Sequence, residues 1–90
     1  MTVRWSPEAA ADFAAIVEYI RKQNPSAAGR VARKIYAGVA ACHHFPIKVV
    51  PETKGTRELV FSSLPYVVVY RVKDEMVEVV RVLHGAQRWP

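Results

Sequence analysis

Residues 66–70 read Tyr-Val-Val-Val-Tyr, an unbroken run of aromatic and β-branched side chains. Such residues favour β-strands, because their flat or branched side chains pack well on a pleated surface. A strand with one face in water alternates apolar and polar residues, and this run does not. The sequence therefore predicts a strand that is apolar on both faces.

Two more strands flank this run along the chain. Thr56–Phe61 precedes it and Met76–Leu83 follows it, and both segments are rich in apolar strand formers. Ser62–Pro65 and Lys73–Glu75 predict the turns between the three strands. At the other end of the chain, the alternating segment Thr2–Trp5 predicts a short fourth strand.

The residues after Trp5 predict a helix. Ser6 is a typical N-cap, Pro7 suits the first helical position, and Glu8 is favourable in the electropositive first turn. We expect this helix to end near Gln23. Its apolar residues recur at helical spacing and define one stripe: Ala9, Phe13, Ile16, Val17 and Ile20.

A second helix follows after a very short connection. Asn24-Pro25-Ser26 repeats the pattern of a cap followed by a proline, so it separates two helices instead of continuing one. So short a connection predicts an antiparallel helical hairpin. Alanines together with Gly29 and Gly38 would let this helix approach its neighbour closely. Its apolar side carries Ala28, Val31, Ala32, Ile35, Val39 and Cys42.

These elements predict a single α+β domain, residues 1–90, with the order β-α-α-β-β-β. A helical hairpin packs on one face of a mainly antiparallel sheet of three to four strands. Residues 43–55 contain two prolines and Gly55 and predict a loop, and residues 84–90 form a short tail.

The predicted sheet carries more apolar side chains than this hairpin covers. Two helices cover one face of a small sheet, so the other face would expose several Val, Leu or aromatic side chains. At about 25 cal/mol per Å², covering ~400 Å² of this surface would contribute roughly 10 kcal/mol before the costs of association. The sequence therefore favours a protein partner. The alternatives are that the loop and tail fold back over this face, or that the chain forms a homodimer.

Composition limits the class of protein. Apolar residues make up 51% and charged residues 23% of the chain, which predicts a folded protein. The net charge of +5 favours acidic partners. Cys42 is the only cysteine, so no internal disulfide is expected. With no signal peptide and no apolar run long enough to span a membrane, we expect a cytoplasmic protein with no membrane partner.

Few residues have the pattern of a catalytic site. Arg57, Arg71 and Arg81 would bind phosphate if they shared a face, but each would equally form a salt bridge, as Arg71 would with Glu78 across the hairpin. His84 has no evident catalytic partner in the sequence. No metal or cofactor motif is present, so no cofactor is expected.

Several motifs together resemble the RelE/ParE superfamily of toxins from type II toxin–antitoxin systems. These motifs extend over nearly the whole chain, in the family's order and spacing: Trp5-Ser6-Pro7-Glu8-Ala9, Arg57-Glu58-Leu59, Pro65-Tyr66, Tyr70-Arg71-Val72 and Val79-Val80-Arg81-Val82-Leu83-His84-Gly85. The resemblance implies the β-α-α-β-β-β fold and a toxin that inhibits growth and stabilises plasmids. It also implies a cognate antitoxin that wraps a disordered, amphipathic and often acidic segment over the toxin.

The superfamily has two mechanisms. RelE-type members cut messenger RNA on the ribosome with a cluster of basic residues, whereas ParE-type members inhibit DNA gyrase without such a cluster. Arg57 keeps a basic position of the RelE pattern and Arg81 lies near another. Leu59, Val67 and Gln87 stand where the pattern has basic residues. No tyrosine follows Gln87 in the 90 residues. The chain therefore resembles ParE more than RelE.

Three functions follow as hypotheses. The first is a non-enzymatic gyrase inhibitor neutralised by a ParD-like antitoxin. The second is a ribosome-dependent mRNA endoribonuclease with a reduced basic site of Arg57, Arg81 and Arg88. The third is a small basic nucleic-acid-binding module. The predicted partner-binding residues are Leu59, Phe61, Arg71, Arg81, His84, Gln87, Arg88 and Trp89.

Overall fold

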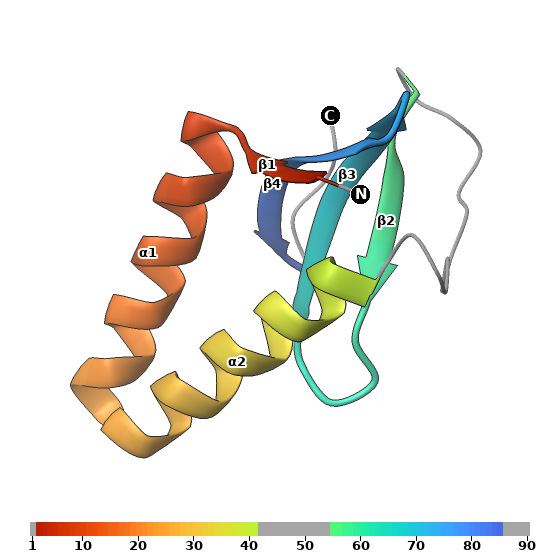
Figure 1. Cartoon of the computed structure of the whole chain (residues 1–90). Coiled ribbons are helices and arrows are strands. Elements are labelled where there is room, and N and C mark those ends of the chain that lie inside the picture. The colour runs from red at the N-terminus through yellow and green to blue at the C-terminus, as the bar shows by residue number, and fades with distance from the viewer. Residues whose placement is uncertain (1, 42–54, 86–90) are drawn as a thin grey trace.

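A computed structural model of the chain describes residues 2–41 and 55–85. The elements follow the order β1 (Thr2–Trp5), α1 (Pro7–Gln23), α2 (Pro25–Ala41), β2 (Arg57–Val60), β3 (Tyr66–Lys73) and β4 (Met76–His84). They form a four-stranded mixed sheet against which the two helices pack, so the predicted α+β fold and element order are confirmed (Figure 1).

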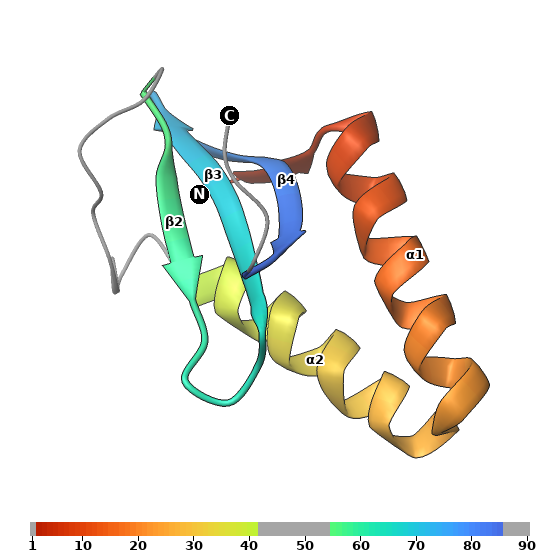
Figure 2. The ribbon, with the colours of Figure 1, turned by 180° about the vertical axis from the view of Figure 1, so that it is seen from behind.

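The strand order in the sheet is β1-β4-β3-β2. The strands β2, β3 and β4 pair antiparallel, while β1 pairs parallel with the first half of β4. Asp74 connects β3 to β4 with a φ of 58°, a conformation that aspartate tolerates better than most residues. A bulge at Val69/Tyr70 shifts the register between β3 and β4. Beyond Trp5, the outer edge of β4 is no longer covered by β1, and α1 lies beside it (Figure 2).

Both helix starts have the predicted caps. The Ser6 hydroxyl accepts a hydrogen bond from the Ala9 amide at 3.0 Å and donates one to the Val80 carbonyl at 2.8 Å. It therefore caps α1 and also holds it to β4. Asn24 accepts from the Ala27 amide at 3.2 Å at the start of α2. With Asn24 as the single residue between the helices, the hairpin forms an open V whose closed end projects away from the sheet (Figures 1 and 2).

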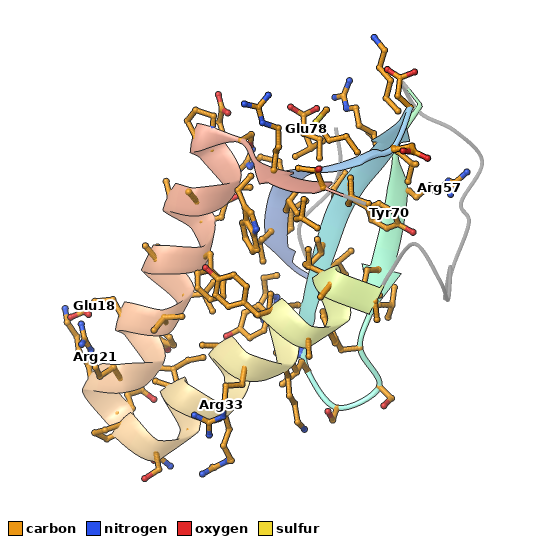
Figure 3. The ribbon with its side chains drawn as sticks, viewed as in Figure 1. Glu18, Arg21, Arg33, Arg57, Tyr70 and Glu78 are labelled. Atoms are coloured by element: carbon orange, nitrogen blue, oxygen red, sulfur yellow. The ribbon has the colours of Figure 1, made fainter. Side chains whose placement is uncertain are left out.

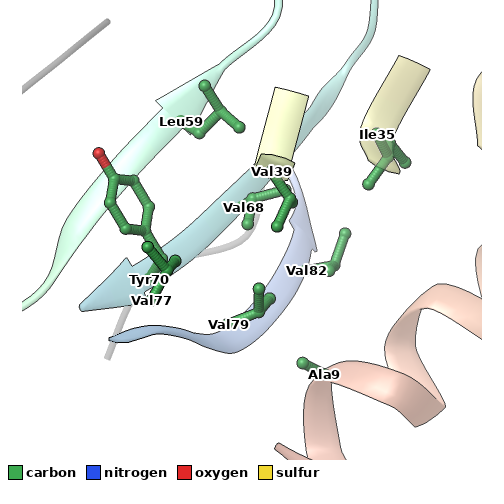
Figure 4. Packing of buried hydrophobic residues seen from close by; sticks show 9 residues of the cluster. All are labelled: Ala9, Ile35, Val39, Leu59, Val68, Tyr70, Val77, Val79 and Val82. Carbon is green, nitrogen blue, oxygen red and sulfur yellow. The ribbon is translucent and has the colours of Figure 1, made fainter. Parts of the chain in front are cut away.

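The core lies between α2 and the sheet. Ile35 and Val39 of α2 are buried with Leu59, Val68 and Tyr70 of the strands (Figure 4). Gly38 permits this approach, because a Cβ at that position would lie 2.6 Å from a ring carbon of Phe61. The glycine thus lets α2 contact β2, whereas the sequence predicted only that this helix would approach its neighbour closely.

The sheet is less exposed than the sequence predicted. Val69 and Leu83, on the face turned away from the core, are 0% and 6% exposed, and no apolar residue of the described strands is exposed. The expectation of an open apolar sheet face is therefore wrong. A bulge lies in the same part of the sheet, where the register between β3 and β4 shifts.

The most exposed large apolar side chains of the described residues are on the hairpin. Ala9 is the only buried residue of α1, and the rest of its apolar stripe is only partly covered. The exposed large hydrophobic residues of the described chain are Tyr19 of α1 and Tyr36 of α2, at 64% and 54%. Helices that diverge from the sheet cannot bury their far halves against it, so α1 keeps an apolar surface.

Candidate partner-binding site

A groove of about 460 Å³ opens between α1 and the adjoining ends of β3 and β4. Four of its residues belong to one stripe of α1, because they recur at the helical intervals of three and four positions. On the opposite side, the rings of Tyr66 and His84 meet edge to face with their centroids 5.9 Å apart. The lining residues are Asp12, Ala15, Ile16, Tyr19, Tyr66, Val82 and His84.

Asp12 forms the polar end of this groove. Its carboxylate accepts hydrogen bonds from Arg81 Nε at 2.7 Å, from Arg81 Nη2 at 3.1 Å and from the Val82 amide at 3.0 Å. The last bond matters because Val82 lies on the edge of β4 beyond β1, where the described part of the chain offers no strand to pair. A side chain of α1 thus takes the place of a neighbouring strand.

The same pairing shifts the pKa of Arg81. Hydrogen bonding to Asp12 raises the pKa of Arg81 above its ordinary value; burial opposes this, and the charges of Asp12 and Glu8 support it. A raised pKa in the folded state means that the stability from this pair is present at neutral pH. It is lost only as the pH rises through that pKa, far into the alkaline range.

A second, more polar hollow of about 390 Å³ lies near the start of α1. It is lined by Ser6, Glu8, Arg71, Glu78, Val80 and Arg81. Arg71 and Glu78 are register partners, and their Nε and Oε1 atoms lie 3.3 Å apart, which confirms the predicted cross-strand ion pair. The two basic residues of this hollow therefore each face a carboxylate.

An aromatic cluster joins β1 and the two helices of the hairpin. The ring centroids of Trp5 and Phe13 are 5.4 Å apart, those of Trp5 and Tyr36 are 5.4 Å apart, and those of Phe13 and Tyr36 are 5.0 Å apart. Tilted contacts of this kind are favourable between aromatic rings. They fix the angle of the V by tying β1, α1 and α2 together.

The arginines of the sheet lie on two surfaces: Arg71 and Arg81 line the same hollow, whereas Arg57 does not. Arg57 is the register partner of Tyr70, and partners share a face, so Arg57 lies on the side of the core (Figure 3). Arg71 is the next residue after Tyr70 and points to the opposite face. Arg81 is on β4, two strands from β2, and its guanidinium is bound by Asp12.

The other predicted residues are dispersed. Leu59 is 1% exposed and belongs to the core, so it offers no surface to a partner in this structure. Phe61 is partly buried under Gly38. His84 lines the groove. Gln87, Arg88 and Trp89 lie outside the described residues.

The α1 side of the groove was not predicted. Asp12, Tyr19 and Tyr66 had no predicted role. The signal was present in the spacing of residues 12, 15, 16 and 19, a second stripe beside the apolar one. Which element this stripe faces depends on the angle between the two helices. The spacing of residues along one helix does not determine that angle.

Within residues 2–41 and 55–85, no three His, Cys, Asp or Glu side chains are grouped so as to hold a metal ion. None of the helices in this part of the chain is both long enough and apolar enough to cross a membrane.

Comparison with known proteins now places the chain. Residues 3–89 match the family model described as the ParE toxin of the type II toxin–antitoxin system parDE. Two relatives are similar over most of their length. Y4kP of Sinorhizobium fredii is 38% identical over 98% of this chain and 92% of that protein. Toxin RelE2 of Caulobacter vibrioides is 36% identical over 94% of this chain and 96% of that protein.

Solved structures share the fold. The chromosomal ParDE toxin–antitoxin system from P. aeruginosa contains a chain with a TM-score of 0.80 and 24% identity, covering 93% of this chain and 95% of that one. The intact E. coli RelBE complex gives a TM-score of 0.59 and 18% identity, covering 97% and 98%. The fold and sequence define a toxin of the RelE/ParE superfamily. Within it, the chain belongs to the ParE toxin family of type II toxin–antitoxin systems.

Proposed function

We propose that this toxin inhibits DNA gyrase in the cytoplasm and does not cleave RNA. The observation that carries the proposal is that Arg57 lies on the opposite face of the sheet from Arg71 and Arg81, and that Arg71 and Arg81 are each paired with a carboxylate. Cleavage of RNA requires groups that activate the 2′-hydroxyl, stabilise the phosphorane and protonate the leaving oxygen around one phosphate. The described residues do not form such a cluster, and membership of the ParE family supports the gyrase mechanism.

The proposal also includes neutralisation by an antitoxin segment that binds the groove beside α1. The partly covered apolar stripe of α1 and the exposed ring of Tyr19 suit the apolar side of an amphipathic helix. Such a segment is disordered when free and folds as it binds. The similar solved structures from P. aeruginosa and E. coli are themselves toxin–antitoxin systems, which supports a partner of this kind.

Two assays on the purified chain separate the mechanisms. We expect the chain to block gyrase-catalysed supercoiling of a relaxed plasmid and to leave ribosome-bound messenger intact in a primer-extension assay. Arg57→Ala is expected to retain growth inhibition, because Arg57 has no catalytic role in this proposal. Cleavage of messenger in the ribosomal A site, with supercoiling unaffected, would show the ribonuclease mechanism instead.

A pair of matched variants tests the groove. Ala15 is exposed and lines it, whereas Ala14 is exposed and does not. Ala15→Arg is expected to weaken binding of the antitoxin encoded beside the toxin roughly tenfold or more, as the loss of a central interface contact does. Ala14→Arg adds the same charge to the same helix and should bind normally. Equal effects of both variants would place the antitoxin elsewhere.

A further inference from the structure

The positive charge of the chain is concentrated in one short segment. Residues 18–34 contain five Arg or Lys residues and one Glu, whereas the rest of the chain contains eight basic and seven acidic residues. Four of the five net positive charges thus belong to 17 residues. These residues are the last turns of α1, the connection and the first half of α2, which together form the closed end of the hairpin.

The basic side chains of this hairpin tip all lie on its surface. They are Arg21, Lys22, Arg30, Arg33 and Lys34, and each is exposed. Glu18, the one acidic residue of the segment, pairs with Arg21 (Figure 3). Lys34 donates a hydrogen bond to Ser63 at 3.1 Å and so marks the boundary of the tip on the side of the sheet.

The three basic residues of α2 follow one stripe of that helix. Arg30, Arg33 and Lys34 are spaced by three and four positions and therefore lie on one side. At about 1.5 Å of rise per residue, Arg30 and Lys34 are separated by about 6 Å along the axis. Like charges this close repel one another, so the isolated chain gains no stability from the arrangement. A polyanion would gain from it.

The surroundings of these charges favour a phosphate backbone over a protein. Protein interfaces have an apolar centre and contain few lysines, whereas the connection here reads Gln23-Asn24-Pro25-Ser26, all exposed. The only aromatic side chain of the segment, Tyr19, lines the groove, so the tip has no stacking platform for single-stranded bases. Duplex DNA presents one charge per about 1.7 Å of its axis and needs no apolar anchor.

We propose that the hairpin tip binds the phosphate backbone of duplex DNA without sequence preference. This binding surface is separate from the groove beside α1 and goes beyond gyrase inhibition. A toxin that acts on a DNA-bound enzyme would be concentrated on DNA near its target. The major groove of B-form DNA is wide enough to admit a helix edge between the phosphates, unlike the narrow one of A-form RNA, so DNA is the expected duplex.

The test measures fluorescence anisotropy of a labelled DNA duplex of arbitrary sequence with the full chain over a range of salt concentrations. The test variant is Arg30→Gln/Arg33→Gln. The control is Arg4→Gln/Lys73→Gln, which removes the same charge from two exposed residues of β1 and β3. Losing two phosphate contacts should reduce the salt slope, log K against log salt, by about 2 and weaken binding roughly tenfold or more at low salt. The control should retain most of the affinity.

Equal losses in the two double variants would overturn the proposal, because binding would then follow net charge and not the tip. Tighter binding of double-stranded RNA, single-stranded DNA or poly-glutamate would overturn it as well. Circular dichroism melting confirms that both variants are folded. Supercoiling inhibition is measured on the same proteins, so a chain that binds DNA without inhibiting gyrase would refute the proposed function and leave this surface intact.

Discussion

Asp12 shows how one side chain serves several parts of this fold. Its carboxylate binds the guanidinium of Arg81 through two hydrogen bonds and the amide of Val82 through a third. Without it, a backbone donor at the edge of β4 and a cation beside it would both lose their partner. Asp12 also forms the polar end of the groove, so the residue joins the stability of the fold to the shape of the site.

Asp12→Ala is therefore expected to reduce the free energy of unfolding by about 1–2 kcal/mol, since hydrogen bonds to charged groups contribute more than neutral ones but this pair is partly solvated. Urea denaturation followed by circular dichroism measures the change. Glu18→Ala is the control, because Glu18 pairs with Arg21 on an exposed helix surface. Its effect should stay within about 0.5 kcal/mol. Similar losses in both variants would contradict the special role of Asp12.

At the scale of elements, α2 approaches β2 more closely than an ordinary helix residue would permit. A Cβ on Gly38 would meet Phe61 ring carbons at 2.6 and 2.9 Å and Leu59 Cδ2 at 3.2 Å. Gly29, in the same helix, would meet only the guanidinium of Arg33, at 3.2 Å, and that group is free to move. Both glycines are helical, but only Gly38 is tightly packed against another element.

Gly38→Ala should destabilise the protein by about 1 kcal/mol or more, because overpacking outweighs the gain in helix propensity. Gly29→Ala should be neutral or stabilising by up to about 1 kcal/mol. Thermal denaturation of the two variants measures the difference. Adding Phe61→Leu to Gly38→Ala should recover part of the loss, since the two positions are in contact. A stabilising Gly38→Ala would show that α2 moves aside at little cost.

The helix α1 is attached to β4 chiefly by its first turns, with Phe13 and Ile16 packed against the core. The Ser6 cap, buried Ala9 and the Asp12 pair attach its start to β4, while its later turns diverge from the sheet. An element attached at one end leaves its other end available for a partner. This arrangement explains why both proposed surfaces, the groove and the hairpin tip, involve the hairpin.

The whole molecule is small, and a domain of 90 residues has a thin margin of stability. An antitoxin segment that binds the folded chain and not the unfolded one should therefore raise the melting temperature markedly. At a free concentration of 100 times Kd the stabilisation is about 2.7 kcal/mol, which corresponds to a rise of more than about 10 °C in a domain of this size. Differential scanning fluorimetry at several antitoxin concentrations measures it.

Ala15→Arg should reduce this rise in melting temperature and Ala14→Arg should not. A melting temperature independent of antitoxin concentration would contradict binding to the folded state. Because this measurement requires no gyrase and no ribosome, it tests the antitoxin proposal separately from the mechanism of toxicity.

The sequence by itself determined the elements and their order. The Ser6 and Asn24 caps, the helical stripes and the run of residues 66–70 are local features, and each one matches the structure because local backbone chemistry decides them. The ion pair of Arg71 and Glu78 was one of the alternatives for these residues, and the two-residue turn between Lys73 and Met76 sets the register that forms it. The family resemblance also rests on such ordered motifs.

Only the tertiary structure decided where the apolar surplus lies. The bulge at Val69/Tyr70 shifts the register between β3 and β4, and the aromatic cluster of Trp5, Phe13 and Tyr36 sets the angle of the hairpin. Both depend on contacts between residues far apart in the chain, which periodicity does not encode. The same reason explains why Asp12 meets Arg81 across 69 positions, and why a groove forms beside α1.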